Sequence, residues 1–188
     1  MIKKTIFHID VNSAFLSWEA AYRIHHLGGA LDLRLIPSAI SGSTEMRHGI
    51  ILAKSTPAKK YGITTGMTTV EAMQKCPGLY LAPPNYSLYQ RCSKAFLSIL
   101  REYTPDVEVY SIDEAFLDMT GVMHLYRNAV DVADEIRERI REELGFTVNV
   151  GISENKLLAK MAGELRKPDY THTLFPEEIP EKIWPLPV

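Results

Sequence analysis

The chain has 188 residues, of which 46% are hydrophobic and 23% charged, and its formal net charge is −2. This length allows one large domain or two small ones, with a core that needs no disulfide staples. Cys76 and Cys92 lack the spacing of metal ligands, so we expect two free thiols in a reducing cytosol. No segment has the apolar length of a signal peptide or a membrane span, which predicts a cytoplasmic protein with no membrane partner.

Short strands and helices are predicted in the first half of the chain. Residues 5–11 alternate in hydropathy and are rich in β-forming side chains, which predicts a strand that ends at Asp10-Val11. Asn12 or Ser13 can cap a helix that reaches about His26. The next expected elements are strands at 33–40 and 49–53 around a turn at 41–43, then helices at 56–62 and 68–75.

Longer elements are predicted from residue 79 onward. The expected strands and helices are, in order, a strand at 79–82, a helix at 87–103, strands at 107–112 and 115–119, a helix at 125–144, a strand at 147–152 and a helix at 154–166. With the first strand added, this order resembles a split βαβ unit. We therefore predict an α+β fold: a ferredoxin-like domain whose antiparallel or mixed sheet has two long helices on one face, with a small inserted α/β subdomain.

Asp10 is the first candidate for a functional residue. It ends the first predicted strand, where Phe7, Ile9 and Val11 make its surroundings apolar. A carboxylate in such a place needs a proton, a partner or a cation. An aspartate at the end of a strand also commonly caps the next helix, so both interpretations stay open for Asp10 alone.

The adjacent acids Asp113 and Glu114 are the second candidate. They lie between two predicted apolar strands, in a turn without Gly or Asn, and neighbouring carboxylates repel unless cations separate them. Taken alone, a solvated turn explains the pair equally well. If the first strand lies beside this hairpin, however, Asp10, Asp113 and Glu114 converge and, with the Val11 carbonyl, could hold two Mg²⁺ ions for phosphoryl transfer.

Charge is unevenly distributed along the chain. Between Ser41 and Lys94 there are seven Lys or Arg residues, Arg47 among them, and only two acids, Glu45 and Glu71. From Glu102 to Leu144 the balance reverses. A basic segment beside an acidic one fits a site for polyanions and metals, but charge alone favours two solvated faces of opposite sign.

Four segments carry a specific resemblance. They are HIDVNSAF at 8–15, ILAKSTPAKKYGITTGM at 51–67, YSIDEAFLDMTG at 110–121 and VGISENKLLAKMAGELRKP at 150–168. In this order and at these spacings they resemble the motifs of Y-family, translesion DNA polymerases of the polymerase IV and V kind. The resemblance covers about residues 6–168, and SIDE followed by GIS-x-NK-x-x-AK is its most specific combination.

The resemblance implies an error-prone, DNA-directed DNA polymerase. Such an enzyme adds dNTPs to a primer 3′-hydroxyl on primer–template DNA during damage bypass and repair. It implies two Mg²⁺ ions, with Mn²⁺ as a substitute, and a sliding clamp as a further partner through a C-terminal region outside this chain. It also implies that 1–13 and 81–175 form the palm, 14–80 the fingers, and 176–188 the start of a linker or thumb, without the thumb and little-finger domains.

The family pattern also assigns individual residues. Asp10, Asp113 and Glu114 match the catalytic metal-binding carboxylates, and the Val11 carbonyl matches a backbone ligand. Phe15 matches the steric gate that crowds a ribose 2′-hydroxyl, although an aromatic residue on an amphipathic helix is ordinarily a core residue. Ser13 and Ala14 match positions whose N–H groups face the triphosphate. Lys167 matches a lysine that contacts the nucleotide phosphates; without the motif it would be an ordinary surface charge.

The fingers segment departs from the family pattern at three positions. Many members have Thr, Tyr and Arg where this chain has Ala53, Thr56 and Lys59. Thr56 and Lys59 remain candidate nucleotide-binding residues, but Thr is shorter than Tyr, and Lys lacks the planar fork of Arg. Lys54 or Lys60 could compensate. The departure is typical of a subfamily closer to the error-prone, damage-induced polymerases.

Two alternatives remain open at this point. The first is another palm-type nucleotidyl transferase, such as a nucleotide cyclase, which would share the strand and hairpin carboxylates but not GISENKLLAK with RKP after it. The second is a polymerase-like scaffold that binds DNA or partner proteins without turnover. Three clustered acids argue against the scaffold, because a site without activity need not keep them.

Overall fold

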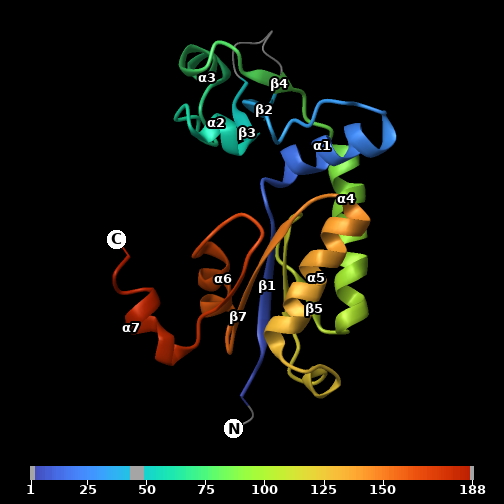
Figure 1. Ribbon diagram of the computed structural model, residues 1–188, viewed down its shortest axis with the longest axis vertical. Helices are drawn as coiled ribbons and strands as arrows, with labels where there is room; N and C mark the ends of the chain where they lie inside the picture. The colour runs from blue at the N-terminus through green and yellow to red at the C-terminus, as the bar shows by residue number, and fades with distance from the viewer. Residues whose placement is uncertain (1–2, 43–48, 187–188) are drawn as a thin grey trace. The chain divides into compact units, whose positions relative to one another are not determined.

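The computed structural model describes residues 3–42 and 49–186 (Figure 1). Ser43 of the predicted turn, and Glu45 and Arg47 of the basic segment, lie outside the described residues. The chain forms two compact units: the large unit comprises Met1–Asn12 and Ser93–Val188, and the small unit comprises Ser13–Cys92. In the described part of the chain, no helix combines the length and the apolar character needed to cross a membrane.

The large unit is built on a five-stranded mixed sheet in the order β5-β6-β1-β7-β8. The strands are β1 (Ile6–Val11), β5 (Val107–Val109), β6 (Glu114–Asp118), β7 (Val148–Ser153) and β8 (Thr171–Thr173). β1 lies between β6 and β7 and is antiparallel to both, whereas β8 runs parallel to β7. The prediction of an α+β fold with a mixed sheet is confirmed.

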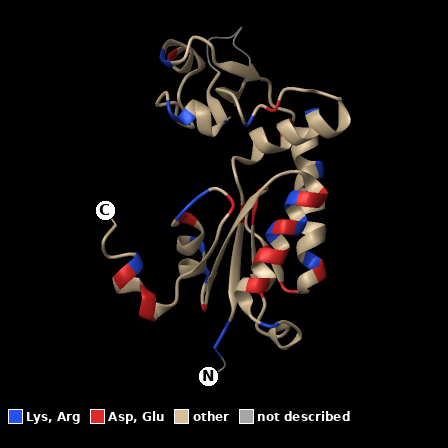
Figure 2. Ribbon diagram, in the orientation of Figure 1, with Lys and Arg blue, Asp and Glu red and all other residues tan. Residues whose placement is uncertain are grey.

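Two long helices cover one face of this sheet (Figure 1). They are α4 (Tyr86–Tyr103), whose first residues belong to the small unit, and α5 (Ala129–Leu144). The Tyr103 hydroxyl donates to Glu135 at 3.0 Å, which joins the two helices. Asn128 caps the start of α5, and Gly145, at φ 75°, ends it in the left-handed conformation that glycine adopts without strain. Charged residues of both signs follow one another along α5 (Figure 2).

Helix α6 (Lys156–Glu164) packs on the other face, close against β7. A Cβ atom at Gly151 would lie 2.0 Å from the Ala159 carbonyl oxygen and 2.4 Å from the Gly163 nitrogen. Only glycine at position 151 therefore allows this close approach of helix to strand. The remaining elements of the large unit are short: η1 (Met123–Leu125), η2 (Pro176–Glu178) and α7 (Ile179–Lys182).

Within its described residues, the small unit has a three-stranded sheet in the order β3-β2-β4 and three helices of its own. The elements are α1 (Ala14–His26), β2 (Ser38–Ser41), β3 (Ile51–Lys54), α2 (Thr56–Lys59), α3 (Thr69–Lys75) and β4 (Tyr80–Ala82). β2 begins only after Pro37, later than predicted, since proline has no amide hydrogen for a ladder. The order of elements from residue 79 onward predicts that β4 belongs to the sheet of the large unit. In the structure β4 instead pairs in parallel with β2.

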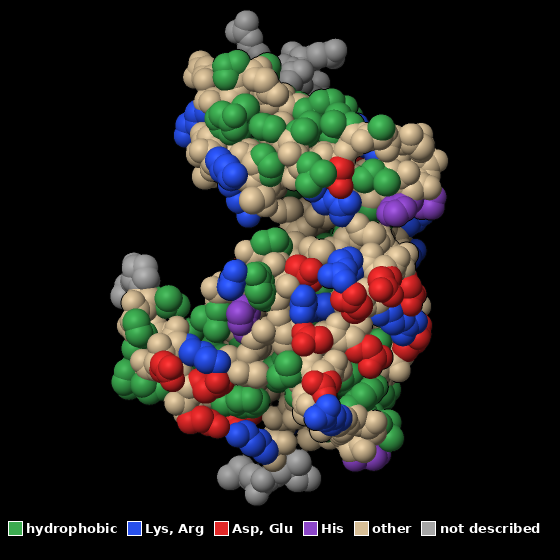
Figure 3. All heavy atoms as spheres, viewed as in Figure 1, with side chains coloured by type: hydrophobic (Ala, Val, Ile, Leu, Met, Phe, Trp, Pro, Cys, Tyr) green, Lys and Arg blue, Asp and Glu red, His purple; other side chains and the backbone are tan. Residues whose placement is uncertain are grey.

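The surfaces of the two units differ in character. In Figure 3 apolar side chains are spread over the visible face of the small unit, whereas charged side chains of both signs mark that of the large unit. Exposed apolar residues of the small unit include Leu27, Leu35, Tyr61 and Val70. Both cysteines are free thiols as predicted: Cys76 is buried and Cys92 is partly buried.

Candidate active site

The strand register brings two of the predicted carboxylates together. Asp10 in β1 lies directly opposite Glu114 in β6, and residues paired in this way project from the same face of an antiparallel sheet. A tight turn precedes Glu114, because the Tyr110 and Ser111 amides both donate to its carbonyl oxygen at 3.1 Å. The Val11 amide donates to the Asp113 carbonyl at 3.0 Å, which ties the turn to the end of β1.

Each carboxylate has a partner on the large unit. Lys167 forms an ion pair with Asp10 and also with Glu164, at 2.6 Å from the latter. Glu114 accepts from His8 Nε2 at 2.8 Å and forms an ion pair with Lys160 of α6. The Ser111 hydroxyl donates to Asp113 at 2.7 Å. Two lysine ammonium groups therefore supply positive charge beside the predicted metal-binding carboxylates.

The net effect of burial and neighbouring charges shifts the pKa values of Asp10 and Glu114 in opposite directions. Burial raises the pKa of Asp10, and the negative charges of Glu114 and Asp113 add to this, against the opposing effect of Lys167. Burial also acts to raise the pKa of Glu114, but Lys160 and His8 outweigh it, so that this pKa is lowered. Asp10 is thus a largely desolvated acid that a nearby cation would stabilise.

The donor set fits a hard divalent cation, although it is not preassembled. Among residues 3–42 and 49–186, no group of three His, Cys, Asp or Glu side chains is arranged to hold a metal ion. The carboxylates of Asp10 and Glu114 instead face lysine ammonium groups, which take the place of a cation. Carboxylate oxygens on one face, near a third acid, are the ligands that Mg²⁺ and Mn²⁺ prefer. The metal site therefore remains a prediction, and these donor atoms are chemically suited to it.

Several residues that lie close to these acids in the sheet or pair with them were not predicted from the sequence. His8 is fully buried, and strand alternation puts it on the same face as Asp10, two positions away. Asn149, opposite Asp10 in β7, is fully buried as well. Lys160 stands within the quoted GISENKLLAK motif, but its partner Glu114 is 46 positions away in the chain. The strand periodicity could have indicated His8; nothing local indicates the pairing of Lys160.

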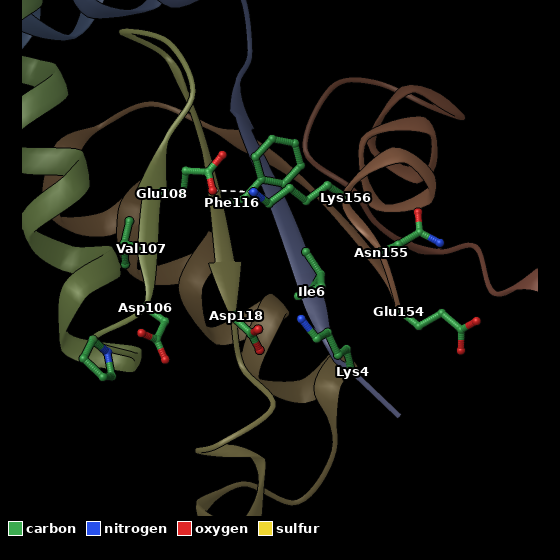
Figure 4. A pocket seen from close by; sticks show the side chains of 11 residues that line it. Lys4, Ile6, Asp106, Val107, Glu108, Phe116, Asp118, Glu154, Asn155 and Lys156 are labelled. Atoms are coloured by element: carbon green, nitrogen blue, oxygen red, sulfur yellow. Dashed lines mark hydrogen bonds and ion pairs between the residues drawn. The ribbon is translucent and has the colours of Figure 1, made fainter. Parts of the chain in front are cut away.

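A separate groove on the large unit contains none of the predicted site residues (Figure 4). Its lining includes the apolar Ile6, Val107 and Phe116 and a rim of mixed charge. The Glu108–Lys156 ion pair crosses it, and the Lys156 ammonium lies 5.7 Å from the centre of the Phe116 ring. The groove is therefore not the location of the predicted chemistry.

The predicted nucleotide-binding residues before position 93 belong to the small unit. Phe15 stacks on Tyr89, with ring centres 4.5 Å apart and planes 8° apart, and meets Tyr86 edge-on at 6.2 Å. Phe15 is only partly buried. Ser13 has a left-handed backbone, at φ 47°, and Ala14 begins α1 directly after it. These positions stand at a helix N-terminus, where backbone N–H groups favour anions.

The three fingers positions that depart from the family pattern differ in exposure. Ala53 is buried in a cluster with Leu16 and Ile40, whereas Thr56 and Lys59 on the short helix α2 are exposed. Lys54 donates to the Thr65 hydroxyl at 3.0 Å. Burial lowers the pKa of Lys54, and the charge of Lys59 lowers it further. Ala53 therefore fills core volume, while Thr56 and Lys59 face solvent.

The family can now be stated from comparison with known proteins. Residues 9–164 match the impB/mucB/samB family. The chain belongs to this family. It is 52% identical to DNA polymerase IV of Clostridium acetobutylicum over 187 residues, covering 100% of this chain and 47% of that protein. It is 40% identical to DNA polymerase IV 1 of Bacillus subtilis over 185 residues, covering 98% and 43%.

Solved structures of this family agree with the fold. A Y-family DNA polymerase chimera superposes with a TM-score of 0.83 at 25% identity, over 98% of this chain and 52% of that one. DinB from Sulfolobus solfataricus superposes with a TM-score of 0.81 at 28% identity, over 93% and 49%. The resemblance to Y-family DNA polymerases is thus confirmed, and the chain spans about half the length of the curated relatives it matches.

Proposed function

We propose that this chain is the palm and fingers part of an error-prone, translesion DNA polymerase. It would add dNTPs to a primer 3′-hydroxyl on primer–template DNA during damage bypass and repair. The observation that carries the proposal is the pairing of Asp10 with Glu114 beside the Asp113 turn, within a chain of the impB/mucB/samB family. Residues 1–13 and 81–175 would be the palm, 14–80 the fingers and 176–188 the start of a linker or thumb.

Asp10, Asp113, Glu114 and the Val11 carbonyl would hold two Mg²⁺ ions, with Mn²⁺ as a substitute. The ions, when bound, supply positive charge to the attacking and leaving oxygens of nucleotidyl transfer. The chain's own lysines would change partners in this process. Lys167, which pairs with Asp10 and Glu164, would release Asp10 to the ions, and its ammonium would then pair with phosphate oxygens of the nucleotide.

The small unit would bind the nucleotide. Phe15, braced by the Tyr89 ring, would exclude a ribose 2′-hydroxyl and so select deoxynucleotides. Backbone N–H groups at Ser13 and Ala14 would face the triphosphate at the start of α1. The exposed Thr56 and Lys59 would make looser contacts than Tyr and Arg. A sliding clamp and a cytoplasmic location stay predictions of the same proposal.

Primer extension tests the proposal directly. The chain is assayed with Mg²⁺ or Mn²⁺ at primer–template concentrations high enough to saturate a weak DNA binder. We expect metal-dependent incorporation of dNTPs by the wild type, lost in Asp113→Asn and kept in the matched control Asp131→Asn, whose exposed side chain lies in the first turn of α5. Absence of incorporation by the wild type with either metal would contradict the proposal; DNA binding without incorporation would then favour the scaffold.

A further inference from the structure

A buried pair of amide side chains, those of Asn12 and Asn149, lies at the end of β1 that carries Asp10. Asn149 in β7 is the cross-strand neighbour of Asp10 and is fully buried, and Asn12 follows Asp10 by two residues and is 7% exposed. The Asn12 side-chain amide donates to the Asn149 side-chain oxygen at 3.0 Å. Polar side chains are buried at a cost unless their hydrogen bonds are made, so the partners of this pair matter.

All four hydrogen-bonding positions of the Asn149 side chain are occupied. Its oxygen accepts from Asn12 and, at 3.4 Å, from the Tyr170 amide. Its nitrogen donates to the Gly163 carbonyl at 3.0 Å and to the Arg166 carbonyl at 2.6 Å. Among side chains, only the amide groups of Asn and Gln offer two donor hydrogens together with an oxygen that accepts two hydrogen bonds. One side chain therefore fastens the end of α6 and both flanks of Lys167.

Asn12, the residue that follows β1, holds the same turn. Its side-chain oxygen accepts from the Asp169 amide at 3.0 Å and from the Thr147 hydroxyl at 2.9 Å. The amide pair thus links the end of β1 to the turn at 166–170 on both sides of the position where Lys167 reaches Asp10. Fully satisfied buried networks of this kind rigidify their surroundings.

The backbone of this turn is held in an unusual conformation. Asp169 has φ 63°, in the left-handed region that residues other than glycine adopt infrequently. Arg137 of α5 donates to the Asp169 carbonyl at 2.6 Å and to its carboxylate at 2.9 Å. Such a conformation persists only where neighbours over-determine it, and it is common at functional sites. Three side chains therefore hold this one turn: Asn12 after β1, Asn149 in β7 and Arg137 in α5.

We propose that Asn149, acting with Asn12, is a positioning residue for nucleotidyl transfer, because it fixes the turn that presents Lys167 to Asp10 and to an incoming triphosphate. The catalytic half of this inference rests on the proposed function; the structural half does not. The four hydrogen bonds of the Asn149 side chain go to residues that are not predicted ligands, so its effect is transmitted through the backbone at Arg166 and Tyr170.

The test compares Asn149→Asp with a matched control, Asn128→Ala. The aspartate has nearly the same shape but loses both donors to Gly163 and Arg166. Asn128 caps α5 through the Asp131 amide at 2.9 Å, so its loss weakens the fold without touching the turn. In hydrogen–deuterium exchange we expect faster exchange of the Asp169 and Tyr170 amides in Asn149→Asp and unchanged exchange there in Asn128→Ala.

Kinetics test the catalytic half on the same variants. We expect Asn149→Asp to lower kcat/KM for the dNTP by about tenfold or more, chiefly through KM, while Asn128→Ala keeps both constants. Unchanged exchange at the turn, or unchanged kinetics with altered exchange, would overturn the inference. If the wild type itself fails to extend primers while amide exchange in Asn149→Asp changes as expected, the proposed function fails and the positioning of the turn stands.

The wild type alone also provides a decisive measurement if Asn149→Asp does not fold. The Asp169 and Tyr170 amides donate to Asn12 and Asn149, so their exchange should be slowed by at least about tenfold relative to an unstructured chain. Exchange of both amides at the rate of an unstructured chain would overturn the inference without any variant.

Discussion

The two units hold their candidate residues by different means. In the large unit, Asp10 and Glu114 are set by strand register, and each has a lysine partner from α6 or the turn after it. In the small unit, Phe15 is set by ring stacking, whereas Thr56 and Lys59 project into solvent from a four-residue helix. The large unit therefore holds each of its candidate acids by several contacts, whereas the small unit holds mainly Phe15, the predicted steric gate.

This difference fits two of the three departures from the family pattern, Thr56 and Lys59, whereas the third, Ala53, is buried. Catalysis by positioning requires groups held by packing and hydrogen bonds, and a change there alters several contacts at once. Exposed positions on a short helix tolerate substitution, since few contacts depend on them. The chain keeps Asp10, Asp113 and Glu114 but has Thr56 and Lys59 at two positions where many members have Tyr and Arg. We expect substitutions in the two units to differ accordingly.

The largest effect is expected from Asp10→Asn. The amide keeps the shape of the side chain but removes the charge that pairs with Lys167 and would bind a cation. We expect primer extension to fall by about a hundred- to a thousandfold. Thermal unfolding should show little loss of stability, because burial disfavours the charge of Asp10 and raises its pKa, and Lys167 keeps its ion pair with Glu164. A variant that extends primers like the wild type would remove Asp10 from the catalytic set.

Gly151→Ala should have the next largest effect, and it tests the packing of the large unit. Its Cβ would overlap backbone atoms of α6, which cannot move as a flexible side chain can. We expect a loss of about 3 kcal/mol in the free energy of unfolding, measured by urea denaturation. Gly121→Ala is the matched control, because no atom lies within 4 Å of its added Cβ. Equal stability of the two variants would show that α6 packs less tightly than described.

Local sequence patterns predicted much of the large unit but little of its long-range pairing. Alternation over residues 5–11 predicted β1. The end of this strand and the SIDE turn predicted which carboxylates are candidates for the site. The pairing of Asp10 with Lys167 joins residues 157 positions apart, and no local pattern encodes such a contact. β4 has only three residues, so its hydropathy suits either sheet, and its parallel pairing with β2 decides where it belongs. Asn149 was missed because a polar residue within an apolar strand gives no sign of its partners.

Phe15→Ala tests the stacked ring of the small unit. Loss of the ring should admit ribonucleotides and reduce discrimination against them by about ten- to a hundredfold, measured as the ratio of kcat/KM for dNTP and rNTP. Tyr89→Phe is the control, since it keeps the stacked ring and removes only the hydroxyl. Unchanged sugar selection in Phe15→Ala would reduce Phe15 to a core residue.

The smallest effect concerns an acid of the small unit that behaves oppositely to Asp10. Burial acts to raise the pKa of Asp32, but the Arg34 guanidinium and backbone amide outweigh it and lower this pKa. A carboxylate with a lowered pKa stabilises the folded state above its unfolded pKa, and this contribution is lost as the pH falls through the folded pKa. Asp32→Asn should therefore cost up to about 1 kcal/mol at neutral pH, with the difference from wild type disappearing in acid. If the free energies of unfolding of wild type and Asp32→Asn still differ below the folded pKa, Asp32 stabilises the loop at Arg34 through its shape and not through its charge. The two units would then differ in packing alone.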